Sequence, residues 1–136
     1  MVVNATLNHA LSLRFRQCRR WKSARIYIIN NIYLEKPDVL AFSCYIWNIE
    51  FTLKVIQEIK KILPQVFIGV GGPEVSYRAE EIFQENKFID CVISGEGEIS
   101  TLELLQKLSL QNDYKKIDFN IDGIYFRNKN YYRRNT

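Results

Sequence analysis

The sequence predicts an α/β fold in which a parallel sheet is covered by helices on both faces. The first observation is a pattern that occurs three times, at residues 38–63, 66–85 and 88–108: an apolar strand-like run, a polar turn and a helical pattern. Such alternation implies right-handed crossovers between parallel strands. The second observation is size, because 136 residues, 47% of them hydrophobic, suffice for one domain with its own core.

Composition excludes several classes of protein. No apolar run approaches the roughly 18 residues of a membrane span, and the N-terminus lacks the order of a signal peptide, so we expect a cytoplasmic protein without a membrane partner. The first 36 residues carry seven Lys or Arg against one Glu. No RNA- or DNA-binding motif accompanies these charges, so a solvated helix face explains them better than a nucleic-acid partner does.

Cysteine and histidine usage argues against a metal or nucleophilic site. Cys18, Cys44 and Cys91 are odd in number and widely spaced, which predicts reduced thiols and no disulfide framework or zinc or iron–sulfur ligand set. Cys44 and Cys91 lie in or just after apolar runs, where a small buried side chain is expected. The single histidine, His9, has no sequence context that supports a catalytic set.

The N-terminal part is predicted to hold a short strand and a helix. Residues 1–3 are apolar and are a candidate first strand. Residues 10–21 fit a helical face only in part. Ile26, Ile29 and Ile32 recur at helical spacing, and a strand there would leave about eight residues before Asp38, fewer than the dozen that a parallel crossover needs.

The first repeat runs from Pro37 to Pro64. Residues 38–43 form a buried-strand pattern. Asn48 is predicted to be the N-cap of the next helix, and Glu50 lies in its first turn, where the helix dipole favours an acid. The face predicted to be buried comprises Ile49, Leu53, Ile56, Ile59 or Lys60, and Leu63.

The second and third repeats have the same organisation. An apolar run at 66–70 breaks into Gly71 and Gly72, which can adopt positive φ. A short helix at 79–85 is expected to bury its apolar side chains and to end at Asn86. The strand at 88–94 precedes a helix in which Ser100 and Glu103 have capping-box spacing. The inward residues predicted for these two helices are Ile82 and Phe83, then Ile99, Leu102, Leu105 and Leu108.

After the third repeat the pattern weakens. Residues 111–116 read as a polar linker, and residues 121–126 as a last strand or hairpin arm. Residues 128–136 are polar, basic and rich in tyrosine.

Three loops are expected to meet in space. The C-terminal ends of parallel strands lie at one edge of the sheet, where ligands bind. The turns at 43–45, 71–74 and 95–98 therefore converge, and their glycines and hydroxyls suit a large flat ligand with polar edges or a nucleotide-like tail. A glycine pair alone is equally well explained by a tight turn.

Other chemistries are weaker matches. Neither a GxGxxG motif opening a helix nor a glycine-rich loop ending in Gly-Lys-Ser/Thr is present. Glu96 and Glu98 could form an acid/base pair, but carboxylates two residues apart in a turn need not face each other. For Glu98, stabilisation of the following helix N-terminus is the better explanation.

Three segments resemble the N-terminal cobalamin-binding domain of radical S-adenosylmethionine (radical SAM) proteins. They are residues 36–50, residues 71–77 (Gly-Gly-Pro-Glu-Val-Ser-Tyr) and residues 90–98, which end in Gly-Glu-Gly-Glu. The resemblance implies a flavodoxin-like Rossmann fold, a three-layer α/β/α sandwich that holds cobalamin over the C-terminal strand ends. It divides the chain into a shortened N-terminal part (1–35), a cobalamin-binding-like core (36–126) and a polar tail (127–136). No second strand is evident in the shortened part.

The resemblance also implies roles for individual residues. Ser43 would lie near the nucleotide tail of the cofactor, Gly71 and Gly72 would line the groove for that tail, and residues 95–98 would form an adjacent wall. The cofactor-binding residues implied in this way are Ser43, Cys44, Tyr45, Gly71, Gly72, Pro73, Glu74, Ser76, Gly95, Glu96, Gly97 and Glu98.

Two family motifs are absent from this sequence. They are the Asp-x-His-x-x-Gly loop that supplies an axial histidine in some cobalamin domains and the Cys-x-x-x-Cys-x-x-Cys motif that binds an iron–sulfur cluster. Our hypothesis is therefore a cobalamin-binding module that is non-catalytic alone and could serve a radical SAM catalytic domain in trans. The alternatives are a degenerate flavodoxin-like domain that docks onto a partner without cofactor and, last, a hydrolase or transferase that uses Glu96 or Glu98.

Overall fold

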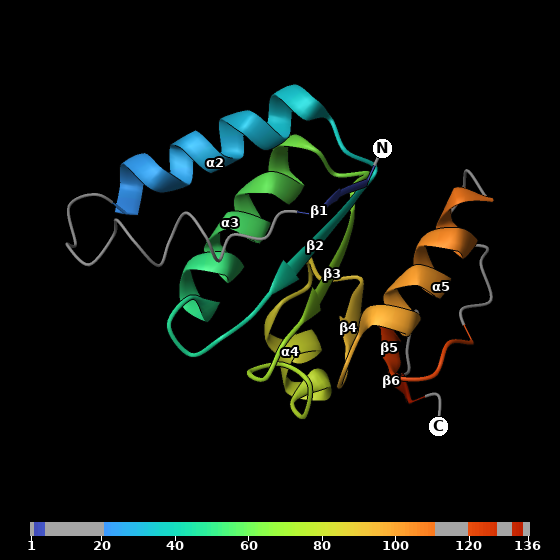
Figure 1. Ribbon diagram of the computed structural model, residues 1–136. Helices are drawn as coiled ribbons and strands as arrows, with labels where there is room; N and C mark the ends of the chain where they lie inside the picture. Colours follow the sequence, from blue (N-terminus) through green and yellow to red (C-terminus); the bar gives the residue numbers. More distant parts are fainter. Residues whose placement is uncertain (1, 5–20, 111–119, 128–131, 135–136) are drawn as a thin grey trace.

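The computed structural model describes residues 2–4, 21–110, 120–127 and 132–134 (Figure 1). Within these residues the strands are β1 (Val2–Asn4), β2 (Val39–Ser43), β3 (Phe67–Gly71), β4 (Cys91–Ile93), β5 (Ile124–Arg127) and β6 (Tyr132–Arg134). The helices are α2 (Trp21–Glu35), α3 (Ile49–Ile62), α4 (Ala79–Glu85) and α5 (Glu98–Ser109). Predictions for His9, Cys18, the helical pattern at 10–21 and the linker at 111–116 lie outside the described residues.

The strands form one sheet in the order β1-β2-β3-β4-β5-β6. Strands β1 to β4 pair in parallel, whereas β5 is antiparallel to both β4 and β6. The predicted α/β fold with a parallel sheet is confirmed, and the pattern at 121–126 is the arm of a hairpin. The sheet also extends beyond the core expected to end at residue 126, because Tyr132–Arg134 forms β6.

Helices cover both faces of the sheet (Figure 1). On one face α2, α3 and α4 enclose a core that includes Leu40, Ile68 and Val92 from the strands. On the other face α5 packs with Leu104 and Leu108 over strand residues such as Phe67. Because side chains alternate along a strand, each strand contributes to both cores. No helix among the described residues has the length and apolar character needed to cross a membrane.

The N-terminal helix agrees with the prediction. Residues 21–35 are helical, and β2 follows directly after it. The sequence shows no second-strand pattern before this helix, and that part of the prediction concerns residues 5–20, which lie outside the described residues. The short helix α4 also buries Ile82 and Phe83 and ends at Asn86, as predicted.

The predicted inner face of α3 is partly wrong. The helix buries Phe51, Thr52, Val55, Ile56 and Ile59, whereas Ile49 and Leu53 are only partly buried. The helix packs against the sheet and against α2, so apolar side chains at its flank contact a helix neighbour. Periodicity identified a helix with an apolar stripe, but the neighbours determine which part of the stripe is innermost.

Two predictions for α5 are also wrong. Ile99 and Leu102 are 81% and 58% exposed, and the helix packs through Leu104 and Leu108. Ser100 lies inside the helix and donates a hydrogen bond to the Asp122 carbonyl at 2.8 Å, so it is no N-cap. The helix begins at Glu98, directly after Gly97, which packs closely against β4: a Cβ at Gly97 would lie 2.6 Å from Ile93 Cγ2.

A carboxylate ties three elements together at the other edge of the sheet. Asp90 Oδ2 accepts hydrogen bonds from the Ile68 backbone N–H at 2.7 Å and from Lys60 Nζ at 2.9 Å. The Asp90 N–H in turn donates to the Ile68 carbonyl at 2.8 Å. One side chain therefore links α3 to β3 and to the segment that leads into β4.

We expect Asp90→Ala to lower the free energy of unfolding by about 1–3 kcal/mol, because it removes the acceptor of a buried backbone N–H. The measurement is urea unfolding, with Asp122→Ala as the control because Asp122 is exposed. Equal losses in the two variants would contradict the assigned role of Asp90.

Candidate cofactor site

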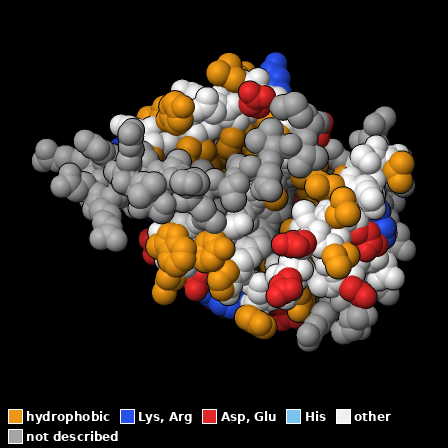
Figure 2. Space-filling view, viewed as in Figure 1, with side chains coloured by type: hydrophobic (Ala, Val, Ile, Leu, Met, Phe, Trp, Pro, Cys, Tyr) orange, Lys and Arg blue, Asp and Glu red, His pale blue; other side chains and the backbone are white. Residues whose placement is uncertain are grey.

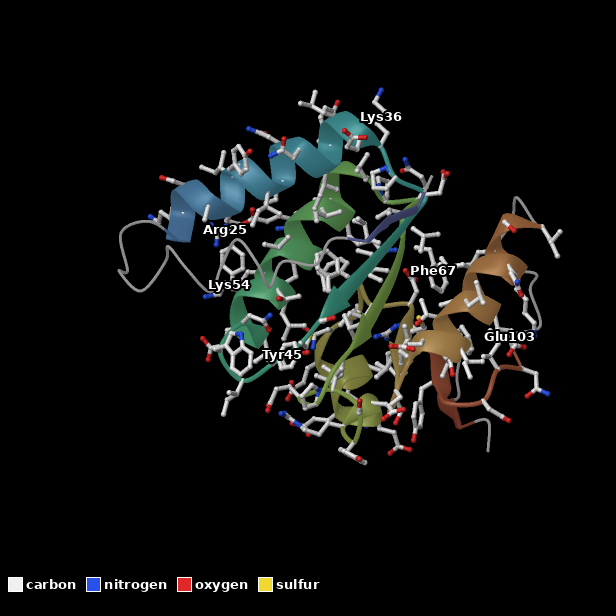
Figure 3. All side chains as sticks on the ribbon, in the orientation of Figure 1. Arg25, Lys36, Tyr45, Lys54, Phe67 and Glu103 are labelled. Carbon is white, nitrogen blue, oxygen red and sulfur yellow. The ribbon has the colours of Figure 1, made fainter. Side chains whose placement is uncertain are left out.

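A cavity of about 620 Å³ opens at the C-terminal ends of β2, β3 and β4. The loops after these strands and the start of α5 line it together, although about 25 residues separate one loop from the next. Figure 3 shows Tyr45 in the first of these loops. The convergence expected from a parallel sheet is therefore present.

The floor of the cavity consists of small side chains on two neighbouring strands. The sheet register pairs Ala41 with Gly69 and Ser43 with Gly71. These residues alternate with the large core residues of β2 and β3, so they lie on the face covered by α5. Ala41, Ser43 and Gly71 line the cavity, whereas the Cys91 side chain covers Gly69, with Sγ 2.9 Å from where a Cβ would stand.

Gly71 and Gly72 serve different purposes. Gly72 has φ +100°, and a Cβ there would lie 2.5 Å from the Cys44 carbonyl oxygen, so this position requires glycine. Gly71 lacks positive φ, and its Cβ would contact Ile93 at an ordinary 3.5 Å. Gly71 therefore provides space in the cavity, whereas Gly72 allows two backbones to approach.

The loops are braced against one another by hydrogen bonds. The Cys44 N–H donates to the Gly71 carbonyl at 2.7 Å, and the Glu74 N–H donates to the Cys44 carbonyl at 3.3 Å. Ser76 Oγ donates to the Gly72 carbonyl at 2.8 Å, and Ser94 Oγ donates to the Ser76 carbonyl at 3.2 Å. The loops after β2, β3 and β4 therefore form one connected rim.

The structure divides the residues predicted from the sequence into two groups. Those that line the cavity are Ser43, Tyr45, Gly71, Gly72, Gly95, Glu96, Gly97 and Glu98. Those absent from its lining are Cys44, Pro73, Glu74 and Ser76. Cys44 and Ser76 are buried, and their hydrogen bonds hold the rim.

Sequence reasoning missed four lining residues: Ala41, Phe42, Ile93 and Thr101. A signal existed for Ala41, because small residues at alternate positions in both strands mark a strand face without large side chains. Thr101 lies one turn into α5, and its place in the cavity depends on how that helix is rotated. No local pattern indicates that rotation.

The two described cysteine thiols are unsuited to nucleophilic chemistry. Burial, with a smaller contribution from the charge of Glu74, raises the pKa of Cys44 from 9.0 to about 12. Burial and the nearby Asp90 charge likewise raise the pKa of Cys91. Both side chains are fully buried and behave as small core residues, as predicted.

The carboxylates at the rim face water. Glu96 and Glu98 are exposed, and acidic side chains gather over this part of the molecule in Figure 2. Glu98 occupies the first turn of α5, where a negative charge stabilises the helix N-terminus. This position agrees with the structural role preferred for it from the sequence.

Comparison with known proteins identifies the family. A family model described as the B12 binding domain matches residues 13–105. The chain belongs to the B12-binding domain family. The resemblance to the cobalamin-binding domain of radical SAM proteins and the prediction of cobalamin as the cofactor are thereby confirmed.

The similar curated proteins are much longer than this chain. The cobalamin-dependent radical SAM methyltransferase TokK of Streptomyces tokunonensis is 40% identical over 83 residues, which are 60% of this chain and 12% of TokK. The 2-(S-pantetheinyl)-carbapenam-3-carboxylate methyltransferase of Streptantibioticus cattleyicolor is 38% identical over 82 residues, again 60% of this chain and 12% of the enzyme. This chain thus matches only a small part of each methyltransferase.

A solved structure supports the fold. OxsB, a cobalamin-dependent S-adenosylmethionine radical enzyme determined with aqua-cobalamin and S-adenosylmethionine bound, matches with a TM-score of 0.64. The match has 18% sequence identity and covers 81% of this chain and 15% of OxsB. At this identity the likeness concerns the fold, and it agrees with the predicted flavodoxin-like arrangement.

The residues of this B12-binding domain fit a large cofactor. The floor formed by Ala41, Ser43 and Gly71 is a place that larger side chains would fill, and the cavity volume lies within the usual range of ligand pockets. Hydroxyls of Ser43, Tyr45 and Thr101 stand among the lining residues and supply hydrogen-bonding groups.

We expect the thiols of Cys44 and Cys91 to be protected by the fold. In a Cys18→Ser variant, both should react with a maleimide far more slowly in the native protein than in urea. Native labelling as fast as labelling in urea would contradict their burial.

We also expect stability to fall at alkaline pH. Above pH 9.0 the unfolded chain releases the Cys44 proton, whereas the folded chain keeps it up to about pH 12. The folding free energy contributed by this group is therefore complete below pH 9.0 and is lost as the pH rises toward about 12. The measurement is the free energy of unfolding in urea at several pH values, for the Cys18→Ser protein and for the same protein with Cys44→Ala added. Identical pH dependences in the two proteins would contradict the contribution of Cys44.

Proposed function

We propose that this domain holds cobalamin in the cavity at the C-terminal ends of β2, β3 and β4 and presents it to a radical SAM catalytic domain, without catalysis of its own. The observation that carries the proposal is the set of small residues Ala41, Ser43 and Gly71 on neighbouring strands, which leaves an open floor at the C-terminal edge of the sheet. Membership of the B12-binding domain family supports cobalamin as the ligand on this floor.

The lining residues suggest how the cofactor would be held. Ala41 and Gly71 leave room for a thick ligand segment, and the Ser43 hydroxyl can both donate and accept hydrogen bonds. Thr101 offers a second hydroxyl from the α5 side, and Gly95 lies at the open mouth, where no atom lies within 4 Å of its Cβ position. These groups bind and orient, and none is a nucleophile or a base.

When bound, cobalamin supplies a cobalt centre that can carry a methyl group or exchange electrons. The TokK name, a radical SAM methyltransferase, supports a catalytic partner of that class. The proposal locates the protein in the cytoplasm, where thiols such as Cys44 and Cys91 stay reduced. The competing hypothesis, a docking domain without cofactor, does not explain the presence of the cavity.

We expect the purified protein to retain cobalamin at one equivalent. The measurement is titration with hydroxocobalamin, then gel filtration with an absorbance scan for co-eluting corrin. A folded, monodisperse protein that elutes without corrin would contradict the proposal and favour the docking hypothesis.

We expect Gly71→Val to fold and to weaken cobalamin binding by at least about tenfold, a loss of roughly 1.4 kcal/mol. A β-branched residue suits a strand, and its Cβ meets only ordinary contacts, but its methyl groups enter the cavity. Affinity is measured by absorbance titration and folding by circular dichroism.

Gly72→Ala is the matched contrast. Its Cβ would clash with the Cys44 backbone at positive φ, so this variant should lose stability. A folded Gly71→Val protein with unchanged affinity would rule out the proposed floor.

A further inference from the structure

Asn48 makes hydrogen bonds that differ from those of an N-cap. It occupies the position before α3, but its side chain makes no capping bond to the helix. The amide oxygen instead accepts the Tyr45 backbone N–H at 2.8 Å, and Nδ2 donates to the Ser43 carbonyl at 3.1 Å. The side chain therefore bridges two backbone groups of the loop that precedes it, and Asn48 takes the predicted N-cap position without a side-chain capping bond.

Both residues held in this way line the cavity, whereas Asn48 itself is only 2% exposed. Cys44 lies between them and is fixed from the other side, because its N–H donates to the Gly71 carbonyl. Ser43, Cys44 and Tyr45 thus have backbone groups bound in sequence by Asn48 and by the end of β3. These bonds hold the backbone of the first wall of the cavity in place.

The chemistry of the amide explains why asparagine is suited to this position. The side chain must offer an acceptor to Tyr45 and a donor to Ser43 at the same time, and a carboxamide provides both. Aspartate keeps the size and the acceptor but has no N–H donor. Alanine provides neither, and the two backbone groups would be left without these partners.

The same loop carries a stacked aromatic pair, in which Tyr45 is half-buried and Trp47 is exposed. The Tyr45 and Trp47 rings stack with centroids 4.7 Å apart and planes within 8°. Ile46 and Trp47 are 76% and 62% exposed, and hydrophobic side chains gather over the loop between β2 and α3 in Figure 2. By fixing the Tyr45 backbone, Asn48 also sets where this aromatic wall stands beside the cavity.

We infer that Asn48 is the positioning residue of the cofactor site, acting on cobalamin through Ser43 and Tyr45 without touching it. This inference rests on the proposed function. Asn48 would strengthen cobalamin binding by ordering the loop in advance. A loop that is already ordered loses less entropy when the ligand binds.

The experiment compares two buried asparagines in the full chain. Asn86 is the matched control: it is 6% exposed, and its Nδ2 donates to the Ile82 carbonyl at 3.0 Å beyond the end of α4, outside the cavity lining. Alanine and aspartate are placed at each position. Thermal unfolding measures stability, and hydroxocobalamin titration measures affinity.

We expect the variants at both positions to lose stability, but only Asn48→Asp and Asn48→Ala to weaken hydroxocobalamin binding, by about tenfold or more. The near-ultraviolet circular dichroism of the stacked aromatic pair should change only in the Asn48 variants. Asn48 variants that bind as tightly as the Asn86 variants would overturn the inference.

Amide hydrogen exchange in the unmodified apoprotein tests the same inference without any variant. The Tyr45 amide should be strongly protected, because its acceptor is buried. Exchange as fast as that of the exposed Gly95 amide would overturn the positioning role. If the unmodified protein failed to bind hydroxocobalamin but protected the Tyr45 amide, the proposed function would fail while the rigid loop would stand.

Discussion

The C-terminal edge of the sheet depends on the approach of Gly72 to the backbone of Cys44. A Cβ at Gly72 would lie 2.5 Å from the Cys44 carbonyl oxygen and 2.9 Å from its nitrogen, so only glycine allows the two loops to meet. Once they meet, the bonds from Cys44 to Gly71 and from Glu74 to Cys44 can form. This approach therefore joins the loops after β2 and β3, which both line the cavity.

The two faces of β2 and β3 carry side chains of different size, so that one face contributes mainly to stability and the other contributes to the cavity. On the face of α3 and α4, strand residues such as Leu40, Ile68 and Val70 are fully buried and supply the hydrophobic core. On the α5 face, the same two strands end in small residues, with Ser43 beside Gly71. The free energy of folding therefore comes mainly from one face, which leaves the strand ends on the other free to accept a ligand.

Local patterns predicted the elements better than their orientation. The strands and helices from α2 to α5 were foreseen because periodicity and turn residues are local properties. The inward faces of α3 and α5 were only partly foreseen, because packing against neighbouring elements sets their rotation. The convergence of three loops could be predicted from parallel topology alone. The position of Thr101 in the cavity lining could not, because it depends on the rotation of α5, which no local sequence pattern indicates.

The site also shows why residue type cannot separate a ligand-binding group from the group that holds it. Ser43 ends β2 and Ser76 lies in the loop after β3, yet only Ser43 lines the cavity, because Ser76 is buried and its hydroxyl is bound to the Gly72 carbonyl. Asn48 is bound in the same manner to the loop before it. The Ser76 and Asn48 side chains are both buried and lie outside the cavity lining, so their bonds position the loops. Tertiary contacts, and not composition, therefore decide which polar groups of this edge can bind and which can only position.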